Sequence, residues 1–276
     1  MTEARGSAGQ AHARYAPGTP CWVSLMVHGL EATQDFYQGL FGWEFRQGPQ
    51  HLGAYVRALL DGRAVAGIGR LPADRRLPVA WTPYLASDDV DSTAHVVRLS
   101  GGTIAVGPLD AADAGRMAIG SDPAGAVFGI WQGAAHPGAA LAGVPGTPAW
   151  NELRTYDSVG VVKFYATAFG YEPRPAAAGG DEGEGKGEGE GEGDYVTLLV
   201  EGRPVAGIRG VGSALPRDRG PHWMTYFEVA DPDAAAERVL ELGGQVLTPA
   251  RDAEHGRVAQ VSDPEGARFS LVRSAR

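Results

Sequence analysis

The sequence predicts an α+β protein built from two tandem domains, and three observations lead to this prediction. First, the chain repeats itself: GTPCW at residues 18–22 returns as GTPAW at residues 146–150, and later motifs return in the same order. Second, residues 31–41 carry apolar side chains at helical spacing. Third, apolar segments flank a DG dipeptide, and EG at the same place in the second copy, which is typical of a β-hairpin.

The repeat continues through most of each copy, which a chance similarity would not do. The matching segments are FYQGLFGWE (36–44) with FYATAFGYE (164–172), YVRALLDGRAVAGI (55–68) with YVTLLVEGRPVAGI (195–208), DDVDSTAHVVRLSGG (88–102) with ADPDAAAERVLELGG (230–244), and GRMAIGSDPAGAVFGIW (115–131) with GRVAQVSDPEGARFSLV (256–272). We therefore expect a disordered tail at 1–17, a first domain at 18–133, a linker at 134–145 and a second domain at 146–273. An acidic Gly/Glu loop at 177–194 accounts for the extra length of the second copy.

Each copy is expected to use the same short elements. In the first copy these are a strand at 22–27, a helix at 31–41 that ends at the glycine of FGW, hairpin strands at 55–60 and 64–68, a strand at 81–86, a helix at about 91–100, and a final strand after the DPAG turn. Each copy is thus predicted as β-α-β-β-β followed by β-α-β-β, with the crossovers on one side of the sheet.

Composition excludes several classes of function. The net charge is -9, but the segment 181–194 holds seven acidic residues and one lysine, so the rest of the chain is nearly balanced. No basic stripe is visible, and nucleic-acid binding is not expected. No apolar run approaches the roughly 20 residues that cross a bilayer, and the N-terminus lacks a signal-peptide pattern, so we expect a cytoplasmic protein. The single cysteine, Cys21, excludes an intrachain disulfide framework and a Cys-rich zinc site.

The strand, the FGW or FGY helix, the hairpin and the closing DPxG strand together resemble the vicinal-oxygen-chelate superfamily, which includes glyoxalases, bleomycin-resistance proteins and extradiol dioxygenases. The tandem arrangement is most similar to its two-domain actinobacterial branch. The resemblance covers roughly residues 18–133 and 146–273. It implies tandem glyoxalase-like domains, each made of paired βαβββ modules whose curved mixed sheets enclose a cavity. Fold alone does not imply one activity, because a common fold hosts many functions.

The resemblance also implies where metal-using relatives hold their ion: early in the first strand, early in the fifth strand, and in the strand after DPxG. These positions hold no strong metal ligand in either copy: they are Trp22, Trp150, Thr82, Met224, Gly129 and Ser270. A divalent cation needs about three or four converging N or O donors. We therefore expect no metal and no cofactor. One alternative stays open, namely a shifted site made by His222, Glu152 and Glu228.

Strand alternation predicts which side chains face the cavity, because successive residues point to opposite faces of a sheet. Val23, Leu25 and Val27 suit the helix side, which sends their neighbours inward. The expected ligand-binding residues are Trp22, Ser24, Tyr84, Trp150, Glu152, Arg154, Tyr226, Glu228 and Arg268. The aromatic members suit a planar ligand, whereas the charged members must be paired or wet. Glu152 and Arg154 are expected either to pair with Arg268 or Glu228 or to fix the polar end of a ligand.

These expectations favour a metal-independent small-molecule binder of the glyoxalase/bleomycin-resistance type, which sequesters or processes a planar metabolite or a reactive carbonyl compound. The alternative is an enzyme: either a metal-dependent glyoxalase, lyase or dioxygenase, or a metal-free isomerase, cyclase or hydroxylase with Glu152 as its catalytic acid or base. Of the seven histidines, His222 and His255 are the best candidates, at a strand start and in the loop before the last strand, and His28 ends the first strand. The repeat also leaves open whether the chain is a monomer with an internal pseudo-dimer or a homodimer.

Overall fold

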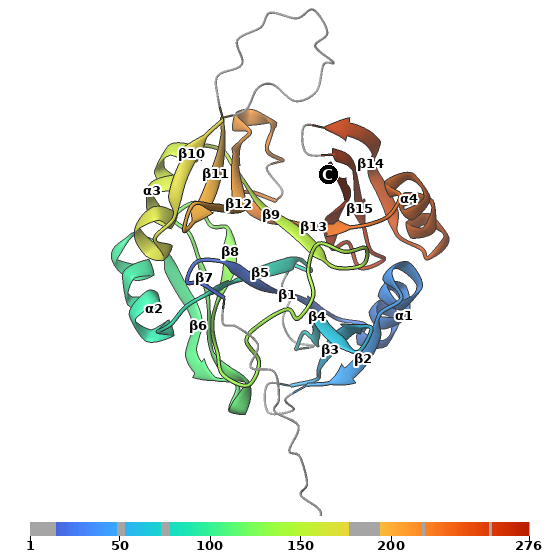
Figure 1. Cartoon of the computed structure of the whole chain (residues 1–276), viewed down its shortest axis with the longest axis horizontal. Helices are drawn as coiled ribbons and strands as arrows, with labels where there is room; N and C mark the ends of the chain where they lie inside the picture. The colour runs from blue at the N-terminus through green and yellow to red at the C-terminus, as the bar shows by residue number, and fades with distance from the viewer. Residues whose placement is uncertain are drawn as a thin grey trace, which may run out of the picture.

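A computed structural model of the chain describes residues 15–48, 53–72, 78–176, 194–216, 219–253 and 256–275. Each copy of the repeat forms one strongly curved eight-stranded sheet, in the order β2-β3-β4-β1-β5-β8-β7-β6 for the first copy and β10-β11-β12-β9-β13-β16-β15-β14 for the second. The two sheets lie back to back, their concave faces point away from each other, and the helices cover the outer flanks in two pairs (Figure 1). The fold is therefore α+β with tandem glyoxalase-like halves.

The elements of the first copy are β1 (Pro20–Val27), α1 (Leu30–Phe41), β2 (Glu44–Gln47), β3 (Tyr55–Leu60), β4 (Arg63–Arg70), β5 (Trp81–Ala86), α2 (Val90–Leu99), β6 (Thr103–Asp110), β7 (Gly115–Ser121) and β8 (Val127–Gly133). Those of the second copy are β9 (Pro148–Thr155), α3 (Ser158–Phe169), β10 (Glu172–Pro175), β11 (Tyr195–Val200), β12 (Arg203–Gly210), β13 (His222–Glu228), α4 (Pro232–Glu241), β14 (Gln245–Ala253), β15 (Gly256–Ser262) and β16 (Arg268–Ser274). No helix in the described part of the chain is long and apolar enough to cross a membrane.

The second half of each copy contains one strand more than the sequence pattern predicts. These strands, β6 and β14, make both halves of each copy βαβββ modules. They lie at the sheet edges, most of their residues are at least partly exposed, and Gly107 and Pro108 interrupt β6. An edge strand with neither a continuous apolar face nor strict alternation gives a weak sequence signal, which explains the missed prediction.

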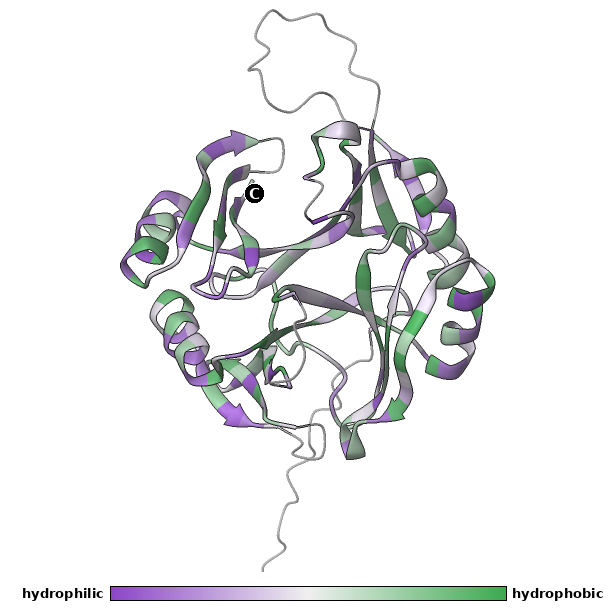
Figure 2. Cartoon of the chain, turned by 180° about the vertical axis from the view of Figure 1, so that it is seen from behind, coloured by the Kyte–Doolittle hydropathy of each residue, from purple (hydrophilic) through white to green (hydrophobic). Residues whose placement is uncertain are grey.

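The predicted alternation along the central strands is confirmed. Val23, Leu25 and Val27 of β1 pack in the core that the helices cover, whereas Trp22 packs on the opposite face. Figure 2 shows the same alternation of apolar and polar residues along many strands. The concave faces therefore carry the residues that the sequence places inward.

Each hydrophobic core on the helix side is shared between the two copies. One core joins α1 and strands β1 to β5 of the first copy to α4, β13, β15 and β16 of the second. The other joins α2, β5, β7 and β8 to α3, β9, β11, β12 and β13. Aromatic rings meet directly across this boundary: Phe41 lies 5.1 Å from Phe227, and Phe128 lies 5.4 Å from Phe169. Neither copy buries its helices without the other.

Repeated motifs supply reciprocal hydrogen bonds at this boundary. Tyr37 of the FY motif accepts a hydrogen bond from Trp81 at 2.9 Å and donates one at 3.2 Å to Asp263, in the SDPxG motif of the other copy. The mirrored set is Tyr165 with Trp223 at 3.0 Å and Asp122 at 3.2 Å. Buried polar groups need such partners, so these motifs hold one copy against the other.

The GTPxW echo has the same explanation. The indole Nε1 of Trp43, in FGW, donates to the carbonyl of Gly146 at 2.7 Å, and the hydroxyl of Tyr171, in FGY, donates to the carbonyl of Gly18. The glycine of each GTP turn thus accepts a hydrogen bond from the aromatic residue that follows the first helix of the other copy. Gly18 and Gly146 both have positive φ, which glycine adopts without strain.

Candidate functional site

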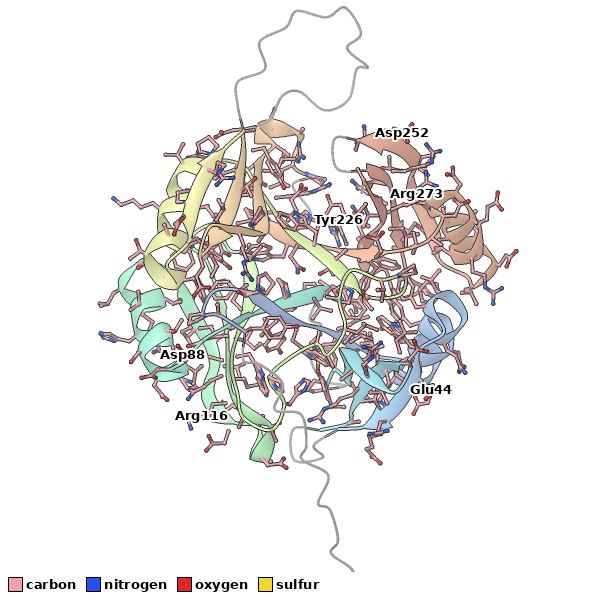
Figure 3. All side chains as sticks on the ribbon, in the orientation of Figure 1. Glu44, Asp88, Arg116, Tyr226, Asp252 and Arg273 are labelled. Atoms are coloured by element: carbon pink, nitrogen blue, oxygen red, sulfur yellow. The ribbon has the colours of Figure 1, made fainter. Side chains whose placement is uncertain are left out.

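The concave face of the second sheet gathers charged and polar side chains from neighbouring strands. Strand register sets three rows across this face: Trp150–Tyr226–Ser270, Gly207–Glu152–Met224, and Arg209–Arg154–His222. Figure 3 shows Tyr226 near the middle of the second sheet, on the side away from the first copy. The rows place polar groups from β9, β12, β13 and β16 on one surface.

Glu152 is the centre of this surface. Its Oε1 accepts hydrogen bonds from Arg154 Nε at 3.0 Å and from the Tyr226 hydroxyl at 3.2 Å, and its Oε2 accepts one from Arg209 Nε at 3.3 Å. Its side chain is only 4% exposed, whereas those of Arg154 and Arg209 are 17% and 30% exposed. A buried carboxylate therefore holds two cations at a surface that solvent reaches. We call Glu152, Arg154, Arg209 and Tyr226 the Glu152 cluster.

Further contacts fix the two guanidinium groups. With its amide oxygen facing Arg154, Gln260 accepts from Nη2 at 3.0 Å and from Nη1 at 3.2 Å. The guanidinium of Arg209 lies 4.8 Å from the centre of the Tyr195 ring, which is a cation–π contact. Each guanidinium still carries more N–H donors than one carboxylate can accept. The surplus donors suit an anionic partner from outside the protein.

The electrostatics of the Glu152 cluster keep its arginines charged and its phenol neutral. Burial acts to lower the pKa of Arg154, but attraction to Glu152 and Tyr226 outweighs it and raises that pKa. Burial first, and then repulsion from Glu152, raise the pKa of Tyr226 well above its ordinary value. Tyr226 therefore donates its proton to Glu152 rather than ionising.

His222 lies at the edge of this surface, beside Arg154 in the sheet. Its Nδ1 lies 2.8 Å from the carbonyl of Gly220. A carbonyl can only accept, so Nδ1 carries the proton. Burial lowers the pKa of His222, so the ring is neutral at pH 7 and its Nε2 is a hydrogen-bond acceptor.

The sequence-predicted residues do not form one site, because the two sheets open in opposite directions (Figure 1). Trp22, Ser24 and Tyr84 lie on the concave face of the first sheet. The other six belong to the second: Trp150, Glu152, Arg154, Tyr226, Glu228 and Arg268. The structure joins Glu152, Arg154 and Tyr226 by hydrogen bonds.

The prediction that Glu152 and Arg154 pair with Arg268 or Glu228 is corrected by the contacts in the structure. Glu228 instead accepts hydrogen bonds from the hydroxyl and backbone N–H of Ser274, at 2.7 and 3.1 Å. The cations on Glu152 are Arg154, its neighbour on the same strand, and Arg209 on β12. Adjacent strands bring these groups close enough to bond directly, so no pairing across the concave face is needed.

Sequence reasoning missed Arg209 and Gln260, although a signal was present. At inward positions the two copies differ: Arg209 stands where the first copy has Gly69, and Glu152 stands where it has Ser24. Arg154 likewise corresponds to Met26. A comparison of the copies, position by position, would have found the cluster, because duplicated positions that become charged together indicate a site in one copy. His255 lies outside the described residues.

The concave face of the first sheet is filled by its own side chains. The hydroxyl of Tyr55 accepts from Trp22 Nε1 at 3.0 Å and lies 3.2 Å from the Ser24 hydroxyl. Tyr84 packs onto the sheet over Gly129, where an added Cβ would lie 2.2 Å from the ring. The corresponding residue in the second copy is Ser270, whose side chain occupies that space. Tyr226 therefore cannot lie on the sheet as Tyr84 does.

Residues after β8 cover part of this first face. The ring of His136 meets Trp22 edge-on, with the ring centres 4.5 Å apart, and Trp131 Nε1 donates to the His136 carbonyl at 2.8 Å. Tyr15, the first described residue, donates to the carbonyl of Ala139 at 2.6 Å. The acidic loop, apart from Asp194, lies outside the described residues, as does the chain before Tyr15.

His136 makes the free energy of unfolding depend on pH. Burial lowers its pKa from 6.5 to about 4. Below pH 6.5 His136 binds a proton in the unfolded chain but not in the folded chain. The free energy of unfolding therefore falls as the pH falls toward 4, by on the order of 3 kcal/mol. We expect His136→Phe to reduce this acid sensitivity in urea titrations from pH 7 to pH 4. The exposed His95→Gln is the control, and equal pH profiles for wild type and His136→Phe would contradict the assignment.

The donor set does not fit a divalent cation. In the part of the chain that the structure describes, no three His, Cys, Asp or Glu residues converge to hold a metal ion. The strand positions expected to carry ligands hold Trp150, Met224 and Ser270 in the second copy. Both oxygens of Glu152 already accept from cationic donors, and those two guanidiniums would repel a second cation. The shifted site of His222, Glu152 and Glu228 is therefore not assembled.

A hollow among the described residues lies away from the Glu152 cluster. A pocket of about 200 Å³ is lined by residues of both copies, among them Gly18, Ser87 and Phe169, at the boundary between the repeats. It contains none of the residues of the Glu152 cluster. It is the competing location for a ligand in the tests below.

Comparison with known proteins identifies the family. The anthracycline biosynthesis protein DnrV of Streptomyces peucetius is 37% identical to this chain over 94% of both proteins. The chain belongs to the vicinal-oxygen-chelate superfamily. The Glyoxalase-like domain family matches residues 152–272, within the second copy. The resemblance inferred from the repeated motifs is thereby confirmed.

Two more comparisons place this superfamily member. CFP32 of Mycobacterium bovis is 37% identical, and the alignment covers 95% of this chain and 97% of CFP32. The Mn(II)-bound glyoxalase of Novosphingobium aromaticivorans is similar in structure, with a TM-score of 0.62, 16% identity, and coverage of 94% of this chain and 82% of that one. At that identity the likeness establishes the fold and nothing about the metal.

Proposed function

We propose that this superfamily member binds a planar, acidic aromatic metabolite on the concave face of its second sheet, without a metal ion, as part of secondary metabolism. One observation carries the proposal: the buried carboxylate of Glu152 holds Arg154 and Arg209 at a surface that solvent reaches. The concave face of the first sheet is filled by its own side chains, and we assign it a structural role.

Charge supports an anionic ligand. On the concave face of the second sheet Glu152 stands against three arginines, Arg154, Arg209 and Arg268, while Glu228 is occupied by Ser274. Guanidinium groups bind carboxylates through paired N–H donors. A ligand anion would use the donors that Glu152 leaves over and would balance the remaining positive charge.

The aromatic residues around the Glu152 cluster support a planar ligand. Trp150 and Tyr226 are neighbours in the sheet, and Tyr195 lies against Arg209. Flat rings bind planar partners by stacking, which contributes about 0.5–1.5 kcal/mol per contact beyond burial. A relative named for anthracycline biosynthesis is consistent with a ligand from secondary metabolism.

The alternative of Glu152 as a catalytic acid or base is less well supported. A general base needs a lone pair directed at the substrate proton. Both oxygens of Glu152 are engaged by Arg154, Arg209 and Tyr226, and its side chain is 4% exposed. Glu152 is better suited to orient the two arginines. If a proton is transferred here, Nε2 of His222 is the better candidate acceptor, because the ring is neutral and Nδ1 carries its proton.

Calorimetric titration of the full-length protein tests the proposal, with anthracene-2-carboxylate as the probe and its neutral methyl ester as the matched compound. We expect the carboxylate to bind at least about tenfold more tightly, since a charge-assisted hydrogen bond contributes about 1.5–3 kcal/mol. Dialysis against EDTA should leave this affinity unchanged. Arg154→Gln should reduce it to that of the ester, and the exposed Arg98→Gln should not. Equal affinity of acid and ester, or loss of binding with EDTA, would count against the proposal.

A further inference from the structure

Two buried hydrogen-bond donors on the concave face of the second sheet have no partner among the described residues. They are the indole Nε1 of Trp150 and the hydroxyl of Ser270. Ser270 is completely buried. Both flank Tyr226 in the same row of the sheet, one on β9 and one on β16. An unpaired buried donor costs free energy, so a native protein that keeps two of them on one surface needs an explanation.

The first copy shows that this cost is avoidable in the same fold. There the tryptophan at the matching position, Trp22, donates to the Tyr55 hydroxyl at 3.0 Å. The position that matches Ser270 is Gly129, which has no polar side chain and is covered by Tyr84. At these two matching positions the first copy therefore leaves no donor unpaired.

We infer that these two donors bind carbonyl oxygens of the ligand. This inference rests on the proposed function and adds the substrate class: an aromatic keto acid or quinone acid, whose acidic group lies with Arg154 and Arg209. Trp150 and Ser270 then receive the acceptors that they lack among the described residues. Both donor atoms are buried, so ligand binding includes a local shift of the side chains that cover them.

The donors make different demands on the ligand from those of the Glu152 cluster. The cluster requires negative charge, which any planar carboxylate supplies. Trp150 and Ser270 require acceptor oxygens on the ring system, which a plain aromatic hydrocarbon lacks. The ligand is therefore recognised by two kinds of oxygen at once, and the two requirements can be tested separately.

The experiment compares anthraquinone-2-carboxylate with anthracene-2-carboxylate, which has the same ring outline and the same acid but no carbonyl groups. Calorimetry of the wild-type protein should give about three- to tenfold tighter binding of the quinone. Ser270→Ala should reduce that ratio toward one while the hydrocarbon acid binds as before. Trp150→Phe should reduce the ratio in the same way, although the smaller ring also weakens stacking with both compounds.

A control variant in the first copy, Ser24→Ala, separates an effect on ligand binding from an effect on stability. Ser24→Ala removes a hydroxyl that is already bonded to Tyr55, so it should lower the melting temperature and leave the quinone preference unchanged. Ser270→Ala should leave the melting temperature unchanged or raise it, because it removes an unpaired buried group.

The outcomes are distinguishable. If neither acid binds, the proposed function fails. If both bind equally well, or if Ser270→Ala leaves the quinone preference intact, the proposed function stands and the inference about carbonyl recognition is overturned. A lower melting temperature for Ser270→Ala, with unchanged binding, would assign Ser270 a structural role instead.

Discussion

Separated copies of the repeat should fail to fold as monomers. Expressed alone, residues 1–145 and residues 146–276 should each lack a cooperative unfolding transition or associate with further copies. The reason is that each core is made by both copies: Tyr37 reaches Asp263, and Phe41 packs on Phe227. A fragment would expose one side of both aromatic cores, a loss far larger than the stability of a typical domain. Near-ultraviolet circular dichroism and urea titration measure this.

The control for this experiment is to mix the two fragments. Together they should recover the dichroism of the intact chain, since the missing half of each core is restored. A monomeric fragment that unfolds cooperatively, as shown by sedimentation and urea titration, would contradict the shared core. It would mean that the two copies are independent folding domains.

Replacing Glu152 by Gln should cost about 2–4 kcal/mol of unfolding free energy, the largest loss expected from a single isosteric change. The amide keeps the shape but removes the charge that Arg154 and Arg209 share, and it leaves two half-buried cations without a counter-ion. The loss lies toward the lower end of the range for buried ion pairs, because both guanidinium groups are partly exposed to solvent. Urea denaturation at pH 7 gives the measurement.

The matched control is Glu31→Gln. Glu31 and Arg70 form a shorter ion pair, at 2.6 Å, but their side chains are 77% and 45% exposed. Water screens this pair, so its loss should not be measurable. Equal losses for the two substitutions would show that Glu152 does not act as the buried support of its arginines, and the positioning role argued above would be wrong.

Much of the fold follows from the sequence because the repeat gives each pattern twice. The FGW and FGY helix ends and the DG and EG hairpins lie where predicted. The strands β6 and β14 were not predicted, since edge strands are exposed on both sides and lack a periodic apolar face. The role of motifs such as SDPxG could not be predicted either, because their partners lie in the other copy: Asp263 bonds Tyr37 and Asp122 bonds Tyr165.

The candidate site was predicted only in part. Alternation placed Glu152, Arg154 and Tyr226 on one face, and the structure joins them. Arg209 was missed because its inward position follows from the parallel pairing of β12 with β9, which a single segment does not reveal. Treating the two faces as one cavity was wrong, because the helices of the two copies pair on the convex sides and turn the concave faces apart.

The difference between the two faces explains how a duplicated chain can specialise. The copy with Gly129 lets Tyr84 lie against its sheet, and Tyr55 then bonds Trp22 and Ser24. Ser270 prevents the same packing in the second copy. This difference is one of several, because the second copy also has Glu152, Arg154 and Arg209 at inward positions. The first copy has Ser24, Met26 and Gly69 there. Together these differences separate a filled face from one that displays polar groups, and each copy still contributes to both shared cores.

The most direct test is a crystal structure of the full-length protein with anthracene-2-carboxylate, prepared from EDTA-dialysed protein. We predict ligand density on the concave face of the second sheet, with the carboxylate within hydrogen-bonding distance of Arg154 and Arg209 and the rings against Trp150 or Tyr226. Density on the first sheet, in the pocket beside Gly18 and Phe169, or around a metal ion held by protein side chains would contradict it.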